Sequence, residues 1–259
     1  MSSSATDIKA IILSAGQGQR LKPLTNDRPK GMVAINGRTI IERQIELFHR
    51  VGIKHVSIVK GFCAESVPDY GARHYLNPEY ATTNMVYSLF AAAEELAGGT
   101  VVVSYGDIVY SEEVLRTLLG VDAPVAVAVD REWKAYFAQR FEDPFDDAES
   151  LIMDAAGGIR SIGQSRPAPT DVQAQYIGLI KFQEAGLTLI RQLYETYSKT
   201  ETALGWGRPW RKAFMTDLLQ ELVNRGERVI AAPISGGWCE VDSAKDFEIA
   251  GRIVAGFLA

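Results

Sequence analysis

Short apolar runs that alternate with amphipathic segments are the feature that most constrains how this chain folds. Such runs occupy residues 8–14, 54–59, 100–104 and 124–129. The segments that separate them carry apolar residues at helical spacing and occupy residues 38–51, 85–96 and 111–119. Continuous apolar strands are typical of a parallel sheet covered on both faces. The pattern therefore predicts a doubly wound α/β fold, a mostly parallel mixed sheet with helices on both faces.

The second half of the chain is less regular. Residues 131–170 are rich in Asp, Pro and Gly, with a hairpin signal at residues 155–158. Strands are expected at 175–182 and 229–233 and helices at 185–197 and 214–224, with a last helix capped by Ser243. No linker separates two independent units. We therefore expect one domain over residues 1–259, with halves at 1–130 and 131–259.

Composition excludes several classes of partner. The net charge is −5 and charged residues make up 23% of the chain, so no basic surface is available for a nucleic acid or an anionic membrane. No apolar run is long enough to span a bilayer, and no signal peptide is recognisable. Cys63 and Cys239 are expected to be thiols, without a disulfide framework or a zinc site. These features favour a cytoplasmic protein.

The first chemical signal follows the first apolar run. Gly16 and Gly18 lie in LSAGQGQR, and Lys30 follows ten residues after Arg20. Small residues after a strand let consecutive backbone N–H groups surround a phosphate, and the two cations can neutralise a triphosphate. The spacing is neither that of a P-loop nor that of a dinucleotide site. Taken alone, the segment could equally be a glycine turn with two solvated cations.

The longer stretch around this signal resembles a known family. Residues 8–48 match, at nearly every position, the opening of nucleotide-sugar pyrophosphorylase-like nucleotidyltransferases, whose pattern is L-[AS]-A-G-x-G-x-R-[LM]-x-P-L-T followed by P-K-x-[ML]. Gly31 departs from the pattern, because many relatives carry Pro or Cys there. The resemblance covers roughly residues 8–250 and implies a Rossmann-like nucleotidyltransferase fold. It also implies an enzyme that transfers a nucleoside monophosphate.

Two acids are candidate metal ligands. Asp107 follows the strand at 100–104, where a carboxylate facing a phosphate site can hold Mg²⁺, although it could equally cap a turn. Many relatives carry D-x-D here, and only the second acid is present. The resemblance places a second ligand at Asp242, in WCEVD. Glu240 would share a strand face with Asp242 and is the reserve candidate. The cofactor that the resemblance implies is Mg²⁺.

A third segment indicates which nucleotide is used. Residues 77–89 (NPEYATTNMVYSL) resemble the N-x-x-[YF]-x-x-x-N-N-x-x-S-L segment of the cytidylyltransferase branch, which includes enzymes that activate phosphocholine, aminoalkylphosphonates and phospho-amino acids. Met85 replaces the second Asn of that pattern. Thr83 or Asn84 could equally be an ordinary helix cap. With this segment, the resemblance implies a nucleotide site formed by Leu13, Ser14, Ala15, Gly16, Gly18, Gln19, Arg20, Lys30, Thr83, Asn84, Ser88, Tyr105 and Gly106.

The implied reaction transfers CMP from CTP to a small phosphorylated or phosphonate acceptor and releases pyrophosphate. Arg20, Lys30, Asp107 and Asp242 are the implied catalytic residues. The expected acceptor residues come from the second half and are Asp130, Trp133, Arg140, Glu149, Tyr176, Trp210 and Asp217, with Trp206 also considered. A sugar-1-phosphate uridylyl- or thymidylyltransferase is one alternative, and a nucleotide-binding regulatory subunit without catalysis is another. The candidate partners are the two substrates and a second copy of this chain.

Overall fold

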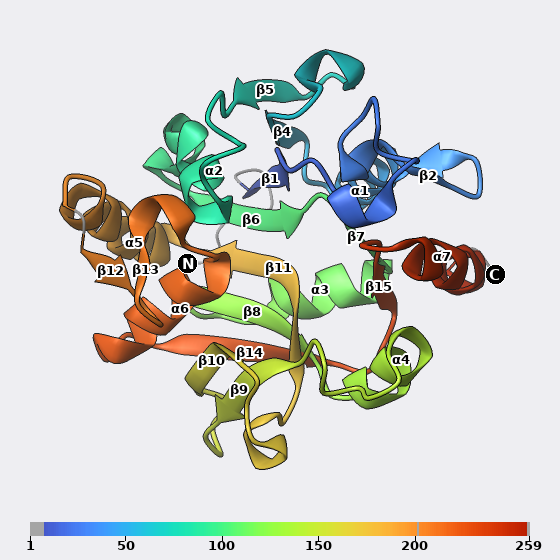
Figure 1. Ribbon diagram of the computed structural model, residues 1–259. Helices are drawn as coiled ribbons and strands as arrows, with labels where there is room; N and C mark the ends of the chain where they lie inside the picture. Colours follow the sequence, from blue (N-terminus) through green and yellow to red (C-terminus); the bar gives the residue numbers. More distant parts are fainter. Residues whose placement is uncertain (1–7, 201, 258–259) are drawn as a thin grey trace.

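The strands of the central sheet form where the apolar runs predict them. The computed structural model describes residues 8–200 and 202–257, shown in Figure 1. Its seven-stranded sheet has the order β14-β8-β11-β6-β1-β4-β5. The strands are β14 (Val229–Ile234), β8 (Val125–Asp130), β11 (Gln175–Phe182), β6 (Thr100–Tyr105), β1 (Ile8–Ser14), β4 (His55–Lys60) and β5 (Arg73–Leu76).

All neighbouring strands of this sheet run parallel except for the pairs made by β11. That strand is antiparallel to both β6 and β8. The sheet is therefore mixed and mostly parallel, as predicted. Because the parallel strands point the same way, their carboxyl ends meet at one edge, where ligands bind in doubly wound folds. Ser14, Tyr105 and Asp130 end their strands at this edge, and Gln175 begins β11 there.

Helices cover both faces of the sheet (Figure 1). One face packs against α1 (Ile40–Arg50), α3 (Glu112–Gly120), α4 (Trp133–Arg140) and α7 (Ala244–Gly256). The other face packs against α2 (Met85–Ala91), α5 (Glu184–Tyr197) and α6 (Met215–Asn224). Alternation along β1 shows the division, because Ala10 and Ile12 belong to the first core and Ile11 and Leu13 to the second. The two layers of helices confirm the doubly wound architecture.

Four small strand pairs complete the fold. Two of them lie near the sheet edge: β7 (Ile108–Tyr110) pairs with β15 (Trp238–Glu240), and β9 (Glu149–Met153) pairs with β10 (Ile159–Ser165). The others are β2 (Ala34–Ile35) with β3 (Arg38–Thr39), and β12 (Ala203–Leu204) with β13 (Arg208–Pro209). The β9–β10 pair accounts for the hairpin signal at residues 155–158. Among the described helices, none combines the length and apolar character that a bilayer-spanning segment needs.

Several predicted boundaries were wrong for local reasons. The first helix begins at Ile40, not residue 38, because Thr39 caps it by accepting from the Glu42 N–H. The helix predicted over 85–96 is α-helical only to Ala91 and continues as a 3-10 turn at Ala93–Ala97. Helix α4 was not predicted, since it lies in the stretch expected to be irregular. The cap predicted at Ser243 is confirmed, and Ser111 caps α3 in the same way, because each side chain accepts a first-turn N–H.

Candidate active site

A cavity opens at the carboxyl ends of β1 and β6. Its walls come from the glycine segment after β1, the 3-10 turn at Lys30–Met32, the start of α2 and the exit of β6. Its lining residues are Leu13, Ser14, Ala15, Gly16, Lys30, Tyr80, Thr83, Asn84, Met85, Ser88, Tyr105, Gly106 and Asp107. We call it the first cavity. Ten of the thirteen residues expected to bind a nucleotide line it, whereas Gly18, Gln19 and Arg20 do not.

The floor of the first cavity is formed where the backbone after β6 packs closely against the backbone at the end of β1. The Gly106 N–H donates to the Leu13 carbonyl at 2.8 Å, and a Cβ at Gly106 would lie 2.8 Å from that oxygen. The Ser14 hydroxyl is buried in this wall and has no hydrogen-bond partner among the described residues. A buried hydroxyl without a partner is costly unless a ligand or water satisfies it. Ser14 therefore marks this floor as a place where a polar ligand group fits.

A second cavity lies beside the first, and Met85 and Tyr105 line both. It is bounded by α4, β9, β11, the start of α6 and the β15 segment. Its lining residues are Arg20, Met85, Tyr105, Phe137, Asp147, Glu149, Gln175, Tyr176, Ile177, Gly178, Phe214, Thr216, Trp238, Glu240 and Asp242. Carboxylates and aromatic rings dominate these walls, and Arg20 is the one cation among the lining residues.

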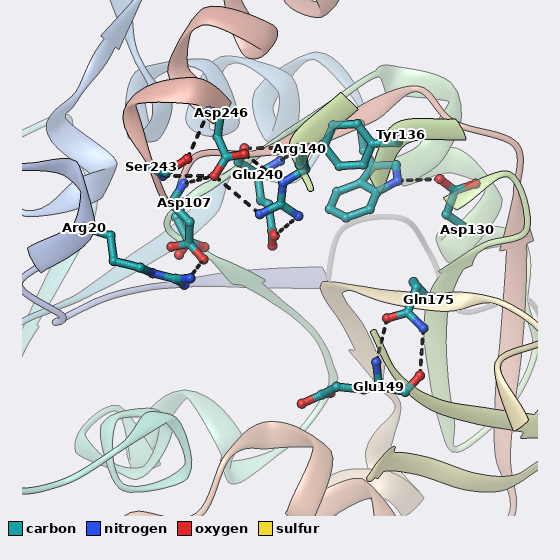
Figure 2. Close-up of polar contacts among 12 residues, drawn as sticks. Arg20, Asp107, Asp130, Tyr136, Arg140, Glu149, Gln175, Glu240, Ser243 and Asp246 are labelled. Carbon is teal, nitrogen blue, oxygen red and sulfur yellow. Dashed lines mark hydrogen bonds and ion pairs between the residues drawn. The ribbon is translucent and has the colours of Figure 1, made fainter. Parts of the chain in front are cut away.

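The four residues expected to be catalytic meet where the two cavities adjoin. The Lys30 ammonium lies 2.9 Å from Asp107 Oδ2 and also pairs with Asp242 Oδ1. The Arg20 guanidinium donates to Asp242 Oδ2 at 2.6 Å. Figure 2 shows the Arg20 side chain beside Asp107 at this point. Two cations from the segment after β1 and two carboxylates from distant parts of the chain thus form one ion-pair chain.

The local backbone brings Lys30 to this position. Gly31, the next residue, is buried so closely that a Cβ would lie 2.7 Å from both Ile41 Cγ1 and Ser14 Oγ. The 3-10 turn that starts at Lys30 therefore packs directly against α1 and β1. Gly18, with a φ of 65°, lies against the aliphatic stem of Lys30. The absence of a side chain at Gly18 thus leaves room for the Lys30 side chain, and Gly18 does not line the cavity.

The acid pair is suited to one divalent cation. Asp107 and Asp242 contact the same ammonium group, so both carboxylates can reach a single ion. Among residues 8–200 and 202–257, no group of three or more His, Cys, Asp or Glu side chains could hold a metal. Two carboxylates suffice for Mg²⁺, which usually completes its shell with phosphate oxygens and waters. The donor set present therefore fits a metal that binds together with a triphosphate.

Glu240, the reserve candidate, has a different partner. Its carboxylate pairs with the buried Arg140 guanidinium, which also binds Asp246 (Figure 2). Burial raises the pKa of Glu240 above its usual value, although the Arg140 charge acts in the opposite direction. The hydroxyl of Tyr136 accepts from the Glu240 N–H at 2.9 Å, which fixes the main chain as well. Glu240 consequently belongs to the wall of the second cavity.

Two carboxylates of that wall, the half-buried Glu149 and the exposed Asp147, have no side-chain partner in the described chain. The Glu149 backbone exchanges hydrogen bonds with the Gln175 amide (Figure 2), which leaves the carboxylate facing the cavity. Burial raises the pKa of Glu149 to about 7, and only Arg208 opposes the shift. The Tyr176 hydroxyl in the same wall is buried and also lacks a hydrogen-bond partner within the described residues. The Glu149 carboxylate and the Tyr176 hydroxyl can receive polar atoms of a ligand.

The other expected acceptor residues do not line either cavity. Asp130 is fully buried and accepts from the Trp238 indole at 2.8 Å, so it fixes a side chain that lines the second cavity without lining the cavity itself. Asp217 is buried, pairs with Arg208 and accepts from the Phe214 N–H at the start of α6. Arg140 is buried between Glu240 and Asp246. The remaining three are Trp133, packed against Phe137 and Phe145; Trp210, packed against Phe90 and Tyr194; and Trp206, which donates to the Ile162 carbonyl.

Sequence reasoning missed part of both walls. Tyr80 and Met85 of the first cavity lie inside the segment 77–89, whose pattern could have indicated them. Phe137 of the second cavity belongs to α4, a helix that was not predicted. Phe214 was expected to be the first residue of a helix, but it is the N-cap before α6. Asp147 lies in the stretch expected to be irregular and carried no signal.

Comparison with known proteins identifies the family of this chain. Residues 10–170 match the model of the MobA-like NTP transferase domain. The chain belongs to this family. Within it, the chain is 33% identical to the CTP:phosphoglutamine cytidylyltransferase of Campylobacter jejuni, over 93% of this chain and 98% of that protein.

Two more comparisons point to the same branch of the MobA-like family. The choline-phosphate cytidylyltransferase of Streptococcus pneumoniae is 41% identical over 37% of this chain and 43% of its own length. The solved structure of CTP:phosphocholine cytidylyltransferase from the same organism superposes with a TM-score of 0.73 at 23% identity, covering 96% of this chain and 99% of that one. The predicted family and fold are confirmed, and the chain is a nucleotidyltransferase.

Proposed function

We propose that this enzyme transfers CMP from CTP to a small phosphorylated or phosphonate acceptor and releases pyrophosphate. The observation that carries the proposal is the meeting of Lys30, Asp107 and Asp242 at the junction of two cavities. A reaction between two anionic substrates needs cations at the point where the substrates meet. Full-length similarity to a CTP-dependent relative supports CTP as the nucleotide.

The first cavity is our candidate for the nucleotide and the second for the acceptor. The backbone at Gly16 and the Ser14 hydroxyl would bind phosphate oxygens, and the start of α2 at Thr83 and Asn84 would lie beside the base. The Asn84 side chain accepts from the Met85 N–H and caps α2, while its amide N–H groups can still donate to a base. We further propose that residues 8–257 act as one domain, with the nucleotide mainly in the first half and the acceptor mainly in the second.

In the proposed reaction, a phosphate or phosphonate oxygen of the acceptor attacks the α-phosphorus of CTP. The bond from that phosphorus to the bridging oxygen breaks, and pyrophosphate leaves with the electron pair. The acceptor oxygen is already anionic at neutral pH, so no general base is required. Positioning and charge neutralisation then supply the catalysis. A lysine ammonium has three donors, so Lys30 can bind Asp107 and Asp242 and still donate to the α-phosphate.

Mg²⁺ is the metal we propose for the acid pair. Asp107 and Asp242 would hold it, and the ion would neutralise charge on the phosphates. Arg20, which pairs with Asp242 at the edge of the second cavity, would contact the acceptor phosphate or the leaving pyrophosphate. Its side chain is 62% exposed, so it can turn toward a phosphate at little cost.

The walls of the second cavity support an acceptor that carries a cationic nitrogen. Glu149, Asp147 and Glu240 supply negative charge, and Tyr176, Phe214 and Trp238 supply aromatic faces. Cations are attracted to both kinds of group. The Tyr176 hydroxyl is buried without a hydrogen-bond partner in the described structure. The Glu149 carboxylate is half-buried in the same wall. These are the two groups we assign to that nitrogen.

A pyrophosphate-release assay with each of the four ribonucleoside triphosphates and dTTP tests the function. The acceptor panel should contain phosphoethanolamine, phosphocholine, a phospho-amino acid, glucose 1-phosphate and n-propyl phosphate. We expect turnover with CTP and an amine-bearing acceptor, and little with n-propyl phosphate. Sugar-nucleotide relatives match this chain at lower identity or over shorter stretches. Turnover of glucose 1-phosphate with UTP or dTTP would instead establish the alternative, and CTP binding without any turnover would establish the regulatory subunit.

A further inference from the structure

Arg140 is a buried guanidinium at the end of α4, outside both cavities. Its side chain is 1% exposed. Its Nε and Nη2 donate to the two carboxylate oxygens of Asp246 at 2.8 and 3.3 Å, and its Nη1 pairs with Glu240. Figure 2 shows the guanidinium between these two acids. One cation therefore binds an acid of the cavity wall and an acid of the last helix.

Asp246 carries this contact to the metal-binding segment. The oxygen that faces Arg140 Nη2 also accepts from the Ser243 N–H at 2.9 Å and from the Asp242 N–H at 3.2 Å. The Ser243 hydroxyl in turn accepts from the Asp246 N–H at 3.2 Å, which completes a capping box. The Asp246 carboxylate thus fixes the main chain at Asp242, and with it the direction of the Asp242 side chain. Arg140 in turn holds the Asp246 carboxylate in place.

Glu240 is the second acid that Arg140 controls. It lies two residues from Asp242, and both side chains line the second cavity. Without Arg140, Glu240 would be a third carboxylate at this point and would compete with Asp107 and Asp242 for a cation. The pair with Arg140, together with the hydrogen bond from the Glu240 N–H to Tyr136, holds Glu240 in the wall of the second cavity.

Stability alone does not account for such an arrangement. The buried Arg140 and Asp246 and the partly exposed Glu240 carry a desolvation penalty that well-packed apolar residues would avoid. Such an ion group is therefore weak evidence for stabilisation. What the group does provide is a fixed direction for each charged side chain. Groups behind a metal ligand commonly change metal affinity by about 10–100-fold when they are altered.

We propose that Arg140 is a positioning residue for the metal-binding acids. It aims Asp242 through Asp246, and it holds Glu240 away from the ion. The inference rests on the proposed role of Asp107 and Asp242 in binding a divalent cation. It assigns to Arg140 a task that differs from the acceptor contact expected from the sequence.

The test measures binding of Mn²⁺ alone by electron paramagnetic resonance, beside the melting temperature. Arg140→Met and Asp246→Asn should each weaken Mn²⁺ binding by about ten-fold. The double variant should lose little more, because both changes interrupt the same path. Arg140→Lys keeps a cation and should recover part of the affinity. Arg208→Met is the matched control, since Arg208 also pairs with a buried acid, Asp217, at a helix start. It should lower the melting temperature and leave Mn²⁺ affinity unchanged.

Three results would overturn the inference. They are wild-type Mn²⁺ affinity in Arg140→Met despite a lower melting temperature, independent losses that multiply in the double variant, and an equal loss of affinity in Arg208→Met. Failure of the proposed function has a different signature. A wild type that binds Mn²⁺ in the Arg140-dependent way and releases no pyrophosphate from CTP would contradict the function and support the positioning role.

Discussion

The Lys30 ammonium lies 2.9 Å from Oδ2 of Asp107, a residue 77 positions later in the chain. The same ammonium pairs with Asp242, a residue 212 positions later. Lys30 therefore holds the two acids at the junction of the cavities and is itself held in place by them. Its charge lies where, in the proposed reaction, negative charge grows on the α-phosphate.

Replacement of Lys30 by Met should remove most turnover and leave the fold intact. An interaction that strengthens in the transition state affects kcat more than KM, and loss of one such donor costs about 10²–10³-fold in kcat. Pyrophosphate release and circular dichroism give the two readouts. Lys54→Met, an exposed lysine beside the start of β4, is the control. An unchanged kcat would contradict the role assigned to Lys30.

Asn in place of Asp107 or Asp242 should abolish most activity, and the double variant should be little worse than either single one. Both acids are expected to serve one ion, so either change disables the same site. Excess Mg²⁺ or Mn²⁺ should rescue the single variants in part. Asp69→Asn, at an exposed turn, controls for the loss of a charge. Losses that multiply, with no rescue by metal, would mean that the two acids do not share an ion.

Glu149→Gln should stabilise the enzyme at pH 7.5 and not at pH 5. Burial raises the pKa of Glu149 from 4.5 to about 7. Between these values the folded state binds a proton that the unfolded state has lost, so stability falls as pH rises. Gln cannot ionise and escapes this loss. The melting temperature of the variant relative to wild type should therefore climb between pH 5 and 7.5, and a constant difference would contradict the raised pKa. Glu248→Gln, an exposed acid on α7, is the control.

The same Glu149→Gln change should weaken an amine-bearing acceptor and spare CTP. Ionised Glu149 is the group we assign to the cationic nitrogen, so the KM for phosphoethanolamine should rise while the KM for CTP stays constant. In the wild type the acceptor KM should increase as pH falls below about 7, because Glu149 becomes protonated. Equal weakening of phosphoethanolamine and n-propyl phosphate would show that Glu149 does not recognise charge.

Gly31→Ala should destabilise the fold by about 1–3 kcal/mol, the usual cost of overpacking a core. A Cβ at this position would lie 2.7 Å from both Ile41 Cγ1 and Ser14 Oγ. Each kcal/mol corresponds to about 2–4 °C in the melting temperature of a chain of this size. Gly120→Ala is the control, because a Cβ there meets nothing within 4 Å. A melting temperature equal to that of wild type would mean that α1 or β1 can move aside.

Local pattern was enough to predict much of this protein. The run at residues 8–14 became β1 with the predicted bounds, and Ser243 capped the last helix. Strand and helix periodicity, caps and glycine turns depend on residues close together in the chain, so a single sequence contains them. The family also followed from contiguous motifs, above all the stretch from Leu13 to Lys30. Asp242 as a partner of Asp107 came from the resemblance, since no local pattern links the two.

Contacts between distant segments decided the rest. Helix α4 escaped prediction, although its Tyr136 and Arg140 fix the main chain and side chain of Glu240. Asp217 and Trp210 looked like ligand-binding residues, but burial gave them roles in the core. In our proposal, the choice of Asp242 over Glu240 as the metal ligand also depends on Arg140, about 100 residues away, because Arg140 pairs with Glu240. The sequence determined which elements form, because their causes are local. The tertiary structure decided which polar side chains remain free for a ligand, because that depends on which partners the fold brings to each of them.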